Sequence, residues 1–427
     1  MPEDMAARYR KYIFPTLKTL YAEPIVMERG EGHYLYDENG VKYLDFFGGI
    51  LTAGIGHANP KVADAVSRQA HKLMHCSTVY VIPGQVELAE RLMGIVPEGI
   101  GKFTFTSSGT EAIEAAILMA QIATGNDEII ALRHSYSGRS KLAIELTALH
   151  NWKQGRAPSS SVKYTHNGYC YRCAFGLKYP SCGMRCAYDL EELIKTSTSG
   201  RIAALLAEPI QGVGGVIVPP PEYFPIVAEI ARKYGGIFIS DEVQTGFGRT
   251  GGKWFGIEHW GVRPDAMTAA KQMASGAPIG ALMARPELAE KWTAPSISTF
   301  GGNPVTMAAA SATLDFMKEN GTKENSELMG RRFMEGLNRI RAKHPSMGEV
   351  RGKGLMVGVE FVKGDKEPAP DIFLKVLEET KRRRLLVGKG GLYGNVMRLS
   401  PAMTITSDEV DQAIAILDEA IGAASRA

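Results

Sequence analysis

Strand-like apolar runs alternate with helical patterns through the middle of this 427-residue chain, and this alternation constrains the fold more than any other feature. Four runs are predicted to be buried strands: Phe103–Thr106, Glu128–Leu132, Ile202–Ala207 and Ile237–Ser240. Three segments are predicted to be helices: Thr110–Ala123, Pro221–Tyr234 and Pro304–Lys318. Strands that are apolar along their whole length are typical of a parallel sheet covered by helices on both faces. We therefore predict a large central α/β domain.

The two ends of the chain carry a different pattern. Gly30–Phe47 alternates like a short antiparallel meander, and Pro60–Met74 is predicted to be helical. Near the C-terminus we predict two helices and two strands: Leu328–Lys343, Asp371–Arg384, Met356–Val362 and Val396–Leu399. These patterns predict one smaller α+β domain made from residues 1–75 and 325–427. The large domain would span residues 76–324, with a cysteine-rich insertion at about 165–187.

Charge and cysteine content exclude several classes of protein. Lys and Arg number 49 against 46 Asp and Glu, so the net charge of +3 argues against a nucleic-acid-binding or membrane-surface protein. No apolar run reaches the roughly 18 residues of a membrane helix. The charged segment Met1–Tyr12 lacks the apolar core of a signal peptide. Because five cysteines are too few for a disulfide scaffold, we expect a cytoplasmic protein.

Four of the five cysteines are close together, at positions 170, 173, 182 and 186. Two closely spaced pairs can supply four thiolates to a tetrahedral zinc ion, which would suit a zinc-dependent interaction module. The alternative is a surface insertion with ordinary or transiently paired thiols. The short separation between the pairs is unlike a zinc ribbon, so we assign no metal site.

Two polar residues next to apolar runs are candidates for chemistry. Asp241 directly follows a predicted strand, where parallel sheets bind ligands, although an aspartate there is more often a helix cap. Lys271 stands among small and uncharged residues. Most lysines are solvated, but burial in such surroundings lowers the pKa of a lysine, as imine formation requires.

Two further segments are suited to binding anions. The segment Ser107–Thr110 leads from a predicted strand into a predicted helix, whose free N–H groups could bind phosphate or be capped by the hydroxyl groups. Arg398 lies in a strand-like run. An arginine there is usually exposed, but it could also grip a substrate carboxylate with two hydrogen bonds.

Taken together, these segments resemble the class III aminotransferases, which depend on pyridoxal phosphate and have the fold-type I architecture. The resemblance covers nearly the whole chain, and its most specific part is SDEVQTGFGRTG at Ser240–Gly251, followed by Lys271 thirty residues after Asp241. EPIQGVGG at Glu208–Gly215 and RLSPAMTI at Arg398–Ile405 are most similar to the alanine–glyoxylate type. The implied fold is a mostly parallel, seven-stranded central sheet with a smaller α+β domain.

The resemblance implies a role for each residue around the cofactor ring. Lys271 would form the Schiff base and move the proton between the substrate and the cofactor. Asp241 would keep the pyridine nitrogen protonated, and Gln244 would reach the ring hydroxyl. Val243 would pack on one face of the ring and Tyr136 on the other.

The resemblance also implies how the cofactor phosphate is held. Ser108, Gly109 and Thr110 would bind it within one subunit. Thr299 would reach it from the neighbouring subunit, which implies a homodimer or a dimer of dimers. Glu208 is a further predicted cofactor-binding residue.

Arg398 is implied to bind the substrate carboxylate. The ornithine and 4-aminobutyrate branches of the family have a masking glutamate where this chain has Val213. We therefore expect a ping-pong aminotransferase that moves an amino group from a small, alanine-like amino acid to glyoxylate or pyruvate. The alternatives are a transaminase of 4-aminobutyrate or another ω-amino acid, a racemase, or a phospho-lyase acting on amino-alcohol phosphates.

Overall fold

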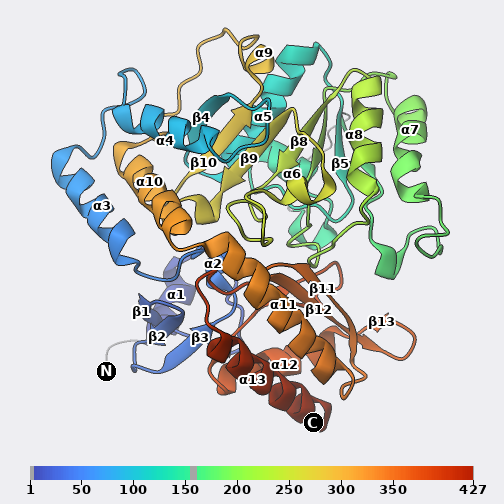
Figure 1. Ribbon diagram of the computed structural model, residues 1–427. Helices are drawn as coiled ribbons and strands as arrows, with labels where there is room; N and C mark the ends of the chain where they lie inside the picture. The colour runs from blue at the N-terminus through green and yellow to red at the C-terminus, as the bar shows by residue number, and fades with distance from the viewer. Residues whose placement is uncertain (1–3, 154–160, 427) are drawn as a thin grey trace.

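A seven-stranded sheet forms the centre of the computed structural model, which describes residues 4–153 and 161–426. Its strands, in spatial order, are β4 (Lys102–Thr106), β10 (Gly280–Ala284), β9 (Ala266–Ala270), β8 (Ile237–Asp241), β7 (Ala204–Ala207), β5 (Ile129–Leu132) and β6 (Val162–Thr165). Strands β9, β8, β7, β5 and β6 pair in parallel, and β10 is antiparallel to both β9 and β4. The predicted mostly parallel sheet is thus confirmed (Figure 1).

Successive residues of a strand point to opposite sides of the sheet. Because the central strands are apolar at consecutive positions, both faces of the sheet are apolar. On β7, Leu206 packs in a cluster with α5 (Gly109–Thr124), while Leu205 packs in another with α7 (Arg185–Ser197) and α8 (Tyr223–Lys233). This two-sided burial accounts for the uninterrupted apolar runs in the sequence. The short helices α6 (Lys141–Leu146) and α9 (Pro286–Ala289) pack beside α5.

Several elements differ from the prediction. Strand β4 lies at the sheet edge and is partly exposed, so the expectation of a fully buried strand was wrong there. Strands β9 (AMTAA) and β10 (GALMA) were not predicted, because alanine and glycine carry little strand signal. Helix α11 (Thr322–Arg341) begins earlier than predicted, and helix α13 (Ser407–Arg426) was missed.

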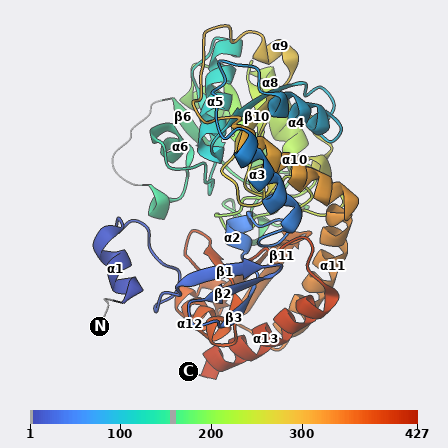
Figure 2. The ribbon, with the colours of Figure 1, turned by 90° about the vertical axis from the view of Figure 1, so that its left-hand side faces the viewer.

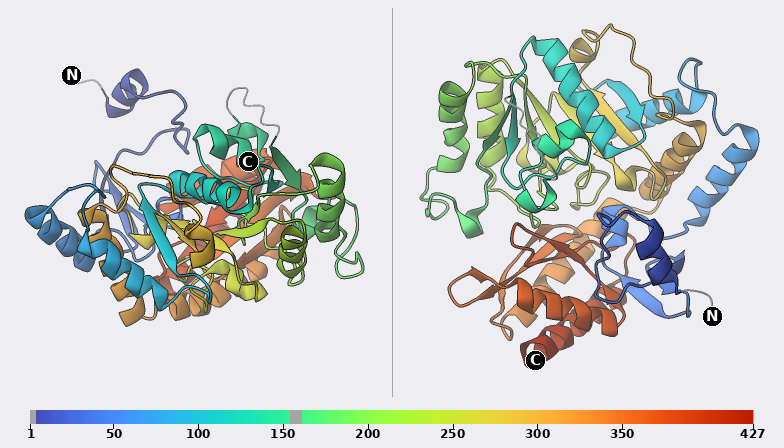
Figure 3. Two further views of the ribbon diagram at one scale, coloured as in Figure 1. Left: turned by 90° about the horizontal axis from the view of Figure 1, so that it is seen from above. Right: turned by 180° about the vertical axis from the view of Figure 1, so that it is seen from behind.

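Both ends of the chain form the smaller α+β part, as expected. Strands β1 (Met27–Glu31), β2 (Tyr34–Asp37) and β3 (Lys42–Asp45) form an antiparallel meander, and β14 (Leu385–Leu386) from the far end of the chain pairs with β3 in parallel. A second sheet has the order β11 (Met347–Lys353), β12 (Met356–Lys363), β16 (Val396–Leu399) and β15 (Gly388–Gly390), and β13 (Glu367–Pro368) pairs with β12. Figure 3 shows both termini at this part of the molecule.

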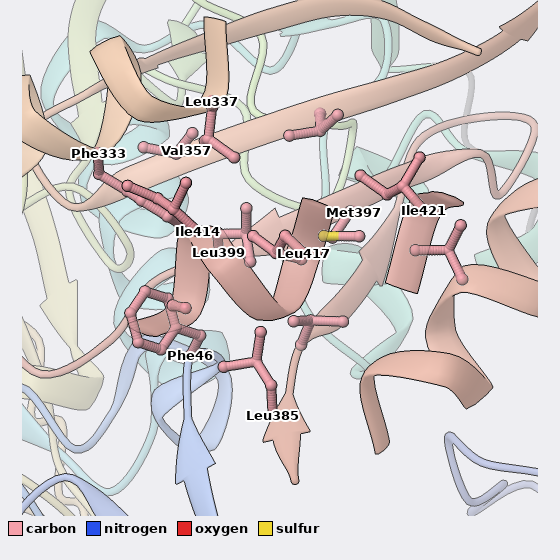
Figure 4. Close-up of a cluster of buried hydrophobic side chains, with 14 of the residues drawn as sticks. Phe46, Phe333, Leu337, Val357, Leu385, Met397, Leu399, Ile414, Leu417 and Ile421 are labelled. Atoms are coloured by element: carbon pink, nitrogen blue, oxygen red, sulfur yellow. The ribbon is translucent and has the colours of Figure 1, made fainter. Parts of the chain in front are cut away.

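One hydrophobic cluster joins these two sheets to the helices α11, α12 (Pro370–Arg382) and α13. Phe46 from the N-terminal segment packs edge-on against Phe333 of α11, with ring centroids 5.3 Å apart. Leu399 and Leu417 belong to the same cluster (Figure 4). Segments from the two ends of the sequence therefore share a single core.

The remaining N-terminal helices lie along the outside. Helix α3 (Pro60–Lys72) packs on α10 (Pro304–Glu319), which also packs on α4 (Pro83–Met93). The exact boundaries of the two domains stay a prediction.

Helix α1 (Met5–Tyr12) has no buried residue and stands away from the rest of the chain (Figure 2). The short helix α2 (Gly48–Leu51) leads from the small part toward the large sheet. No helix in the described ranges is long and apolar enough to cross a membrane.

The four clustered cysteines of the insertion come together in the folded chain. All five cysteines are free thiols, and four of them line one small cavity of about 20 Å³. Among residues 4–153 and 161–426, no three Cys, His, Asp or Glu side chains are arranged so that they could hold a metal ion. The insertion instead contacts the smaller part of the molecule, where Tyr169 and Arg172 hydrogen bond to Glu360 of β12.

Candidate active site

Lys271 directly follows β9 at the end of the strand. Its backbone is in the left-handed region, with φ of 50°, which is a costly conformation for a lysine and is found mainly at functional sites. Removal from bulk water lowers the pKa of Lys271 to about 8, while the carboxylate of Asp241 acts in the opposite direction. A larger fraction of this amine is therefore neutral near pH 8 than in a solvated lysine.

Asp241 ends the neighbouring strand β8, so its carboxylate lies at the same edge of the sheet as Lys271. Its Oδ1 accepts hydrogen bonds from the Val243 N–H and the Thr268 hydroxyl, both at 3.1 Å. Burial raises the pKa of Asp241 above its ordinary value. Because both hydrogen bonds use Oδ1, Oδ2 can interact with a further donor.

A helix N-terminus opens onto this region. Ser108 caps α5 and its Oγ accepts a hydrogen bond from the Glu111 N–H at 3.2 Å. The next residues, Gly109 and Thr110, begin the helix, where free N–H groups and the helix dipole favour an anion. Gly138, with φ of 134°, approaches Thr110 so closely that a Cβ there would stand 2.1 Å from Oγ1.

A cavity of about 190 Å³ brings most of the predicted site residues together. It is lined by Gly109, Thr110, Ile113, Tyr136, Ser137, Gly138, Arg139, Glu208, Asp241, Val243, Gln244, Ala270 and Lys271. Of the predicted residues, only Ser108, Thr299 and Arg398 are not part of this lining. Ser108 directly precedes Gly109, and Arg398 is connected to the cavity through Gln244. Thr299 lies in the loop before α10, and its predicted partner belongs to another subunit.

Glu208 connects two loops of the cavity wall. Its Oε1 accepts the Tyr136 N–H at 3.1 Å, and its Oε2 accepts the Gly212 N–H at 2.9 Å. Burial and the neighbouring Asp241 raise the pKa of Glu208 to about 8. The glutamate thereby fixes the loop that carries Tyr136 against the loop that carries Gly212.

Arg398 on β16 is 3% exposed, unlike most strand arginines. Its Nη2 donates to Gln244 Oε1 at 2.7 Å, and its guanidinium lies 5.4 Å from the centre of the Phe47 ring. Its Nε–H is buried without a hydrogen-bond partner among the described residues. Desolvation lowers the pKa of Arg398 to about 10, so it remains cationic at neutral pH. The buried, partly unpaired cation is suited to a carboxylate.

Sequence reasoning assigned no binding contact to three contributors to this site, although it named the loop Phe47–Ala53 for substrate specificity. Arg139 lines the cavity beside Tyr136, and its place directly after the Ser137–Gly138 turn was the available signal. Phe47 contacts the Arg398 guanidinium from the other end of the chain. Gly212 contacts Gln244, and only the folded structure reveals this proximity.

A lysine of lowered pKa, a buried aspartate and a helix N-terminus fit the aldehyde, the ring nitrogen and the phosphate of pyridoxal phosphate. Together with the mostly parallel sheet, these groups define a pyridoxal-phosphate-dependent enzyme of fold-type I. The family model for aminotransferase class-III matches residues 18–421, so the chain belongs to the class III aminotransferases. The predicted family and cofactor are thereby confirmed.

The chain is similar to proteins that are named for different activities. It is 37% identical over 415 residues to alanine–glyoxylate aminotransferase 2 homolog 2, mitochondrial, from Arabidopsis thaliana, covering 96% of this chain and 86% of the relative. It is 37% identical to the acetylornithine aminotransferase of Caldanaerobacter subterraneus, and the match covers 96% of this chain and 98% of that relative. The solved structure of a phospholyase from Arthrobacter in complex with phosphoethanolamine superposes with a TM-score of 0.92 at 29% identity. The superposition covers 98% of this chain and 99% of the phospholyase chain.

Proposed function

We propose that this chain transfers an amino group from a small amino acid such as alanine to glyoxylate or pyruvate in two ping-pong half-reactions. The buried Arg398 carries this proposal: it hydrogen bonds to the cavity-lining Gln244, and its Nε–H has no hydrogen-bond partner among the described residues. Both the amino acid and the 2-oxo acid have a carboxylate adjacent to the reacting carbon. The same arginine can therefore bind the substrate of either half-reaction.

The residues around the cavity are proposed to divide the work as follows. When bound, pyridoxal phosphate supplies an electron sink for the charge that develops at the substrate Cα. Asp241 would hold the proton on the pyridine nitrogen, and Lys271 would attach the cofactor and move the proton between Cα and C4′. Gln244 is proposed to reach the ring hydroxyl. Val243 and Tyr136 are proposed to pack on the two faces of the ring.

Phosphate binding is assigned to the start of α5. Ser108, Gly109 and Thr110 provide a hydroxyl-rich helix N-terminus, which supports this assignment. Glu208 is proposed to act on the cofactor site indirectly, because its hydrogen bonds fix the Tyr136 and Gly212 loops.

A homodimer, or a dimer of dimers, is part of the proposal because Thr299 is expected to contact the phosphate bound by the neighbouring subunit. Two adjacent exposed segments support such an interface. Ile297 and Phe300 are each 64% exposed, and Val81 is 86% exposed. The Phe300 ring lies 5.2 Å from that of His75, so the two segments are contiguous.

We also propose a cytoplasmic location for the protein.

Val213 argues against the branches that act on ω-amino acids. Those branches mask the arginine with a glutamate at this position, whereas a valine cannot pair with Arg398. Arg398 is instead held by the neutral amide of Gln244. The proposal therefore favours donors and acceptors that both carry a carboxylate adjacent to the reacting carbon.

A donor–acceptor screen of the purified protein tests the proposal. Alanine with glyoxylate or pyruvate should give the highest kcat/KM, and β-alanine, 4-aminobutyrate and ornithine should be poorer donors. Phospho-lyase activity is the second candidate because of the similarity to the Arthrobacter phospholyase. Release of phosphate from phosphoethanolamine without any 2-oxo acid would favour that activity and contradict transamination.

A further inference from the structure

Gly212 lies where any larger residue would collide with the side chain of Gln244. A Cβ built on Gly212 would stand 2.2 Å from Gln244 Oε1, 2.5 Å from Cδ and 2.6 Å from Nε2. All three distances are shorter than a van der Waals contact, so the carboxamide lies directly against the Gly212 backbone. The backbone of Gly212 is outside the left-handed region, so alanine is conformationally acceptable here and only the space is lacking.

The oxygen that contacts Gly212 is also the one that holds Arg398. Gln244 Oε1 accepts the hydrogen bond from Arg398 Nη2 at 2.7 Å. Gly212 itself is fixed, because its N–H donates to the buried carboxylate of Glu208 at 2.9 Å. The carboxamide therefore lies between the Gly212 backbone and the guanidinium.

The other contacts of Arg398 leave its orientation dependent on Gln244. Phe47 covers the guanidinium with its ring, and Gly390 allows the aliphatic stem to approach, since a Cβ there would be 2.6 Å from Arg398 Cδ. Neither contact is a hydrogen bond that fixes the rotation of the planar group. Nε has no partner among the described residues.

We propose that Gly212 is a positioning residue for substrate recognition: by lacking a side chain, it lets Gln244 orient the Arg398 guanidinium toward the substrate carboxylate. This inference rests on the proposed function, in which Arg398 binds that carboxylate. Gln244 is uncharged, so it orients the cation without neutralising it. Among the described residues no carboxylate forms an ion pair with Arg398, and Glu208 acts on it only through its field, so a substrate carboxylate has no paired carboxylate to displace.

Calorimetric binding of propionate to the cofactor-loaded protein tests the inference without relying on turnover. Propionate has a carboxylate but no amine, so its dissociation constant reports the Arg398 site. Gly212→Ala should raise this constant about tenfold, the effect expected when a hydrogen bond to a charged group is lost. The KM values for alanine and pyruvate should rise together, with a smaller change in kcat.

A double-mutant cycle shows whether Gly212 acts through Gln244. Gln244→Ala should weaken propionate binding about as much as Gly212→Ala. In the Gln244→Ala background there is no carboxamide to displace, so adding Gly212→Ala should change the dissociation constant less than about twofold. The single variant Gln244→Ala also keeps the inference testable if Gly212→Ala does not fold.

Gly422→Ala is the matched control, because it makes the same substitution in α13 with no atom nearer than 3.5 Å to the added carbon. It should leave propionate binding unchanged. The role of Gly212 would be overturned if either Gly212→Ala or Gln244→Ala bound propionate as tightly as the unsubstituted protein. It would also be overturned if adding Gly212→Ala to the Gln244→Ala variant weakened propionate binding as much as Gly212→Ala does alone. Failure of the unsubstituted protein to bind propionate would instead contradict the proposed function, and the inference with it.

Discussion

Arg398 lies in surroundings that are unusual for a charged residue. A guanidinium that is 3% exposed has lost most of its hydration, and the neutral Gln244 and the Phe47 ring replace only part of it. Desolvation is accordingly the main reason that the pKa of Arg398 falls to about 10. A carboxylate ligand would restore what this cation lacks.

Removing this cation should affect both half-reactions equally. We predict that Arg398→Ala lowers kcat/KM for alanine, glyoxylate and pyruvate by about two orders of magnitude, since two charge-assisted hydrogen bonds are lost. Arg398→Lys should recover only part of the loss, because an ammonium lacks the planar fork. Steady-state kinetics would contradict this role if the alanine variant matched the unsubstituted enzyme.

The lowered pKa of Lys271 makes a prediction about pH. The neutral amine is the form that can attach the cofactor, and it becomes the majority above pH 8 rather than above the ordinary value of 10.5. The rate at which the cofactor-free protein attaches pyridoxal phosphate should therefore rise to a plateau with a midpoint near pH 8.

Asp241→Asn provides the control for this pH profile. The Asp241 carboxylate raises the pKa of Lys271, so removing its charge should move the midpoint below pH 8. The rates can be followed by absorbance over a pH series. A rate that still increases above pH 10 would show that Lys271 behaves as a solvated lysine.

At the scale of elements, the insertion and the second small sheet are held together by buried charges. Arg351 of β11 donates to Glu360 Oε2 at 2.7 Å and to Glu349 Oε2 at 2.5 Å, and Arg172 of the insertion also pairs with Glu360. Arg351 further donates to the Gly215 carbonyl at 2.6 Å. This network thus connects the insertion and the small sheet to the loop that carries Gly212.

Glu360→Ala should be strongly destabilising, because it leaves two guanidinium groups without their shared carboxylate. Glu360 is 1% exposed, and breaking a buried ion pair from one side costs about 3–5 kcal/mol of unfolding free energy. Asp371→Ala, which breaks the exposed pair with Lys363, should change stability little. The unfolding free energies of both variants can be measured in urea. Similar losses of unfolding free energy in the two variants would contradict this account.

The elements show where prediction from sequence succeeds and where it stops. Asp241 could be predicted as a site residue because an apolar run ends at it, and Lys271 because its neighbours are uncharged. The strand before Lys271 could not be predicted, because its sequence AMTAA does not alternate between apolar and polar residues and contains a single β-branched residue, a threonine. The hydrogen bond between Gln244 and Arg398 joins residues 154 positions apart, so only the folded chain reveals it.

At the scale of the whole molecule, the proposed dimer makes a mutational prediction. Ile297→Asp places a charge in the exposed apolar segment next to Thr299, where burial in an interface would be costly. It should convert a dimer of 46.4 kDa chains into monomers and weaken cofactor binding. Leu374→Asp on α12 is the control, because Leu374 is similarly apolar and exposed but lies outside that segment. Light scattering that finds equal masses for both variants would contradict the interface.

A single half-reaction tests the central claim most directly. The enzyme loaded with pyridoxal phosphate is mixed with alanine in the absence of any 2-oxo acid, and the pyruvate formed is counted against the active sites. Transamination predicts one equivalent of pyruvate per site, after which the reaction stops until glyoxylate is added. Absence of pyruvate, or ammonia released continuously without an acceptor, would contradict the assignment of this enzyme as an alanine-type aminotransferase.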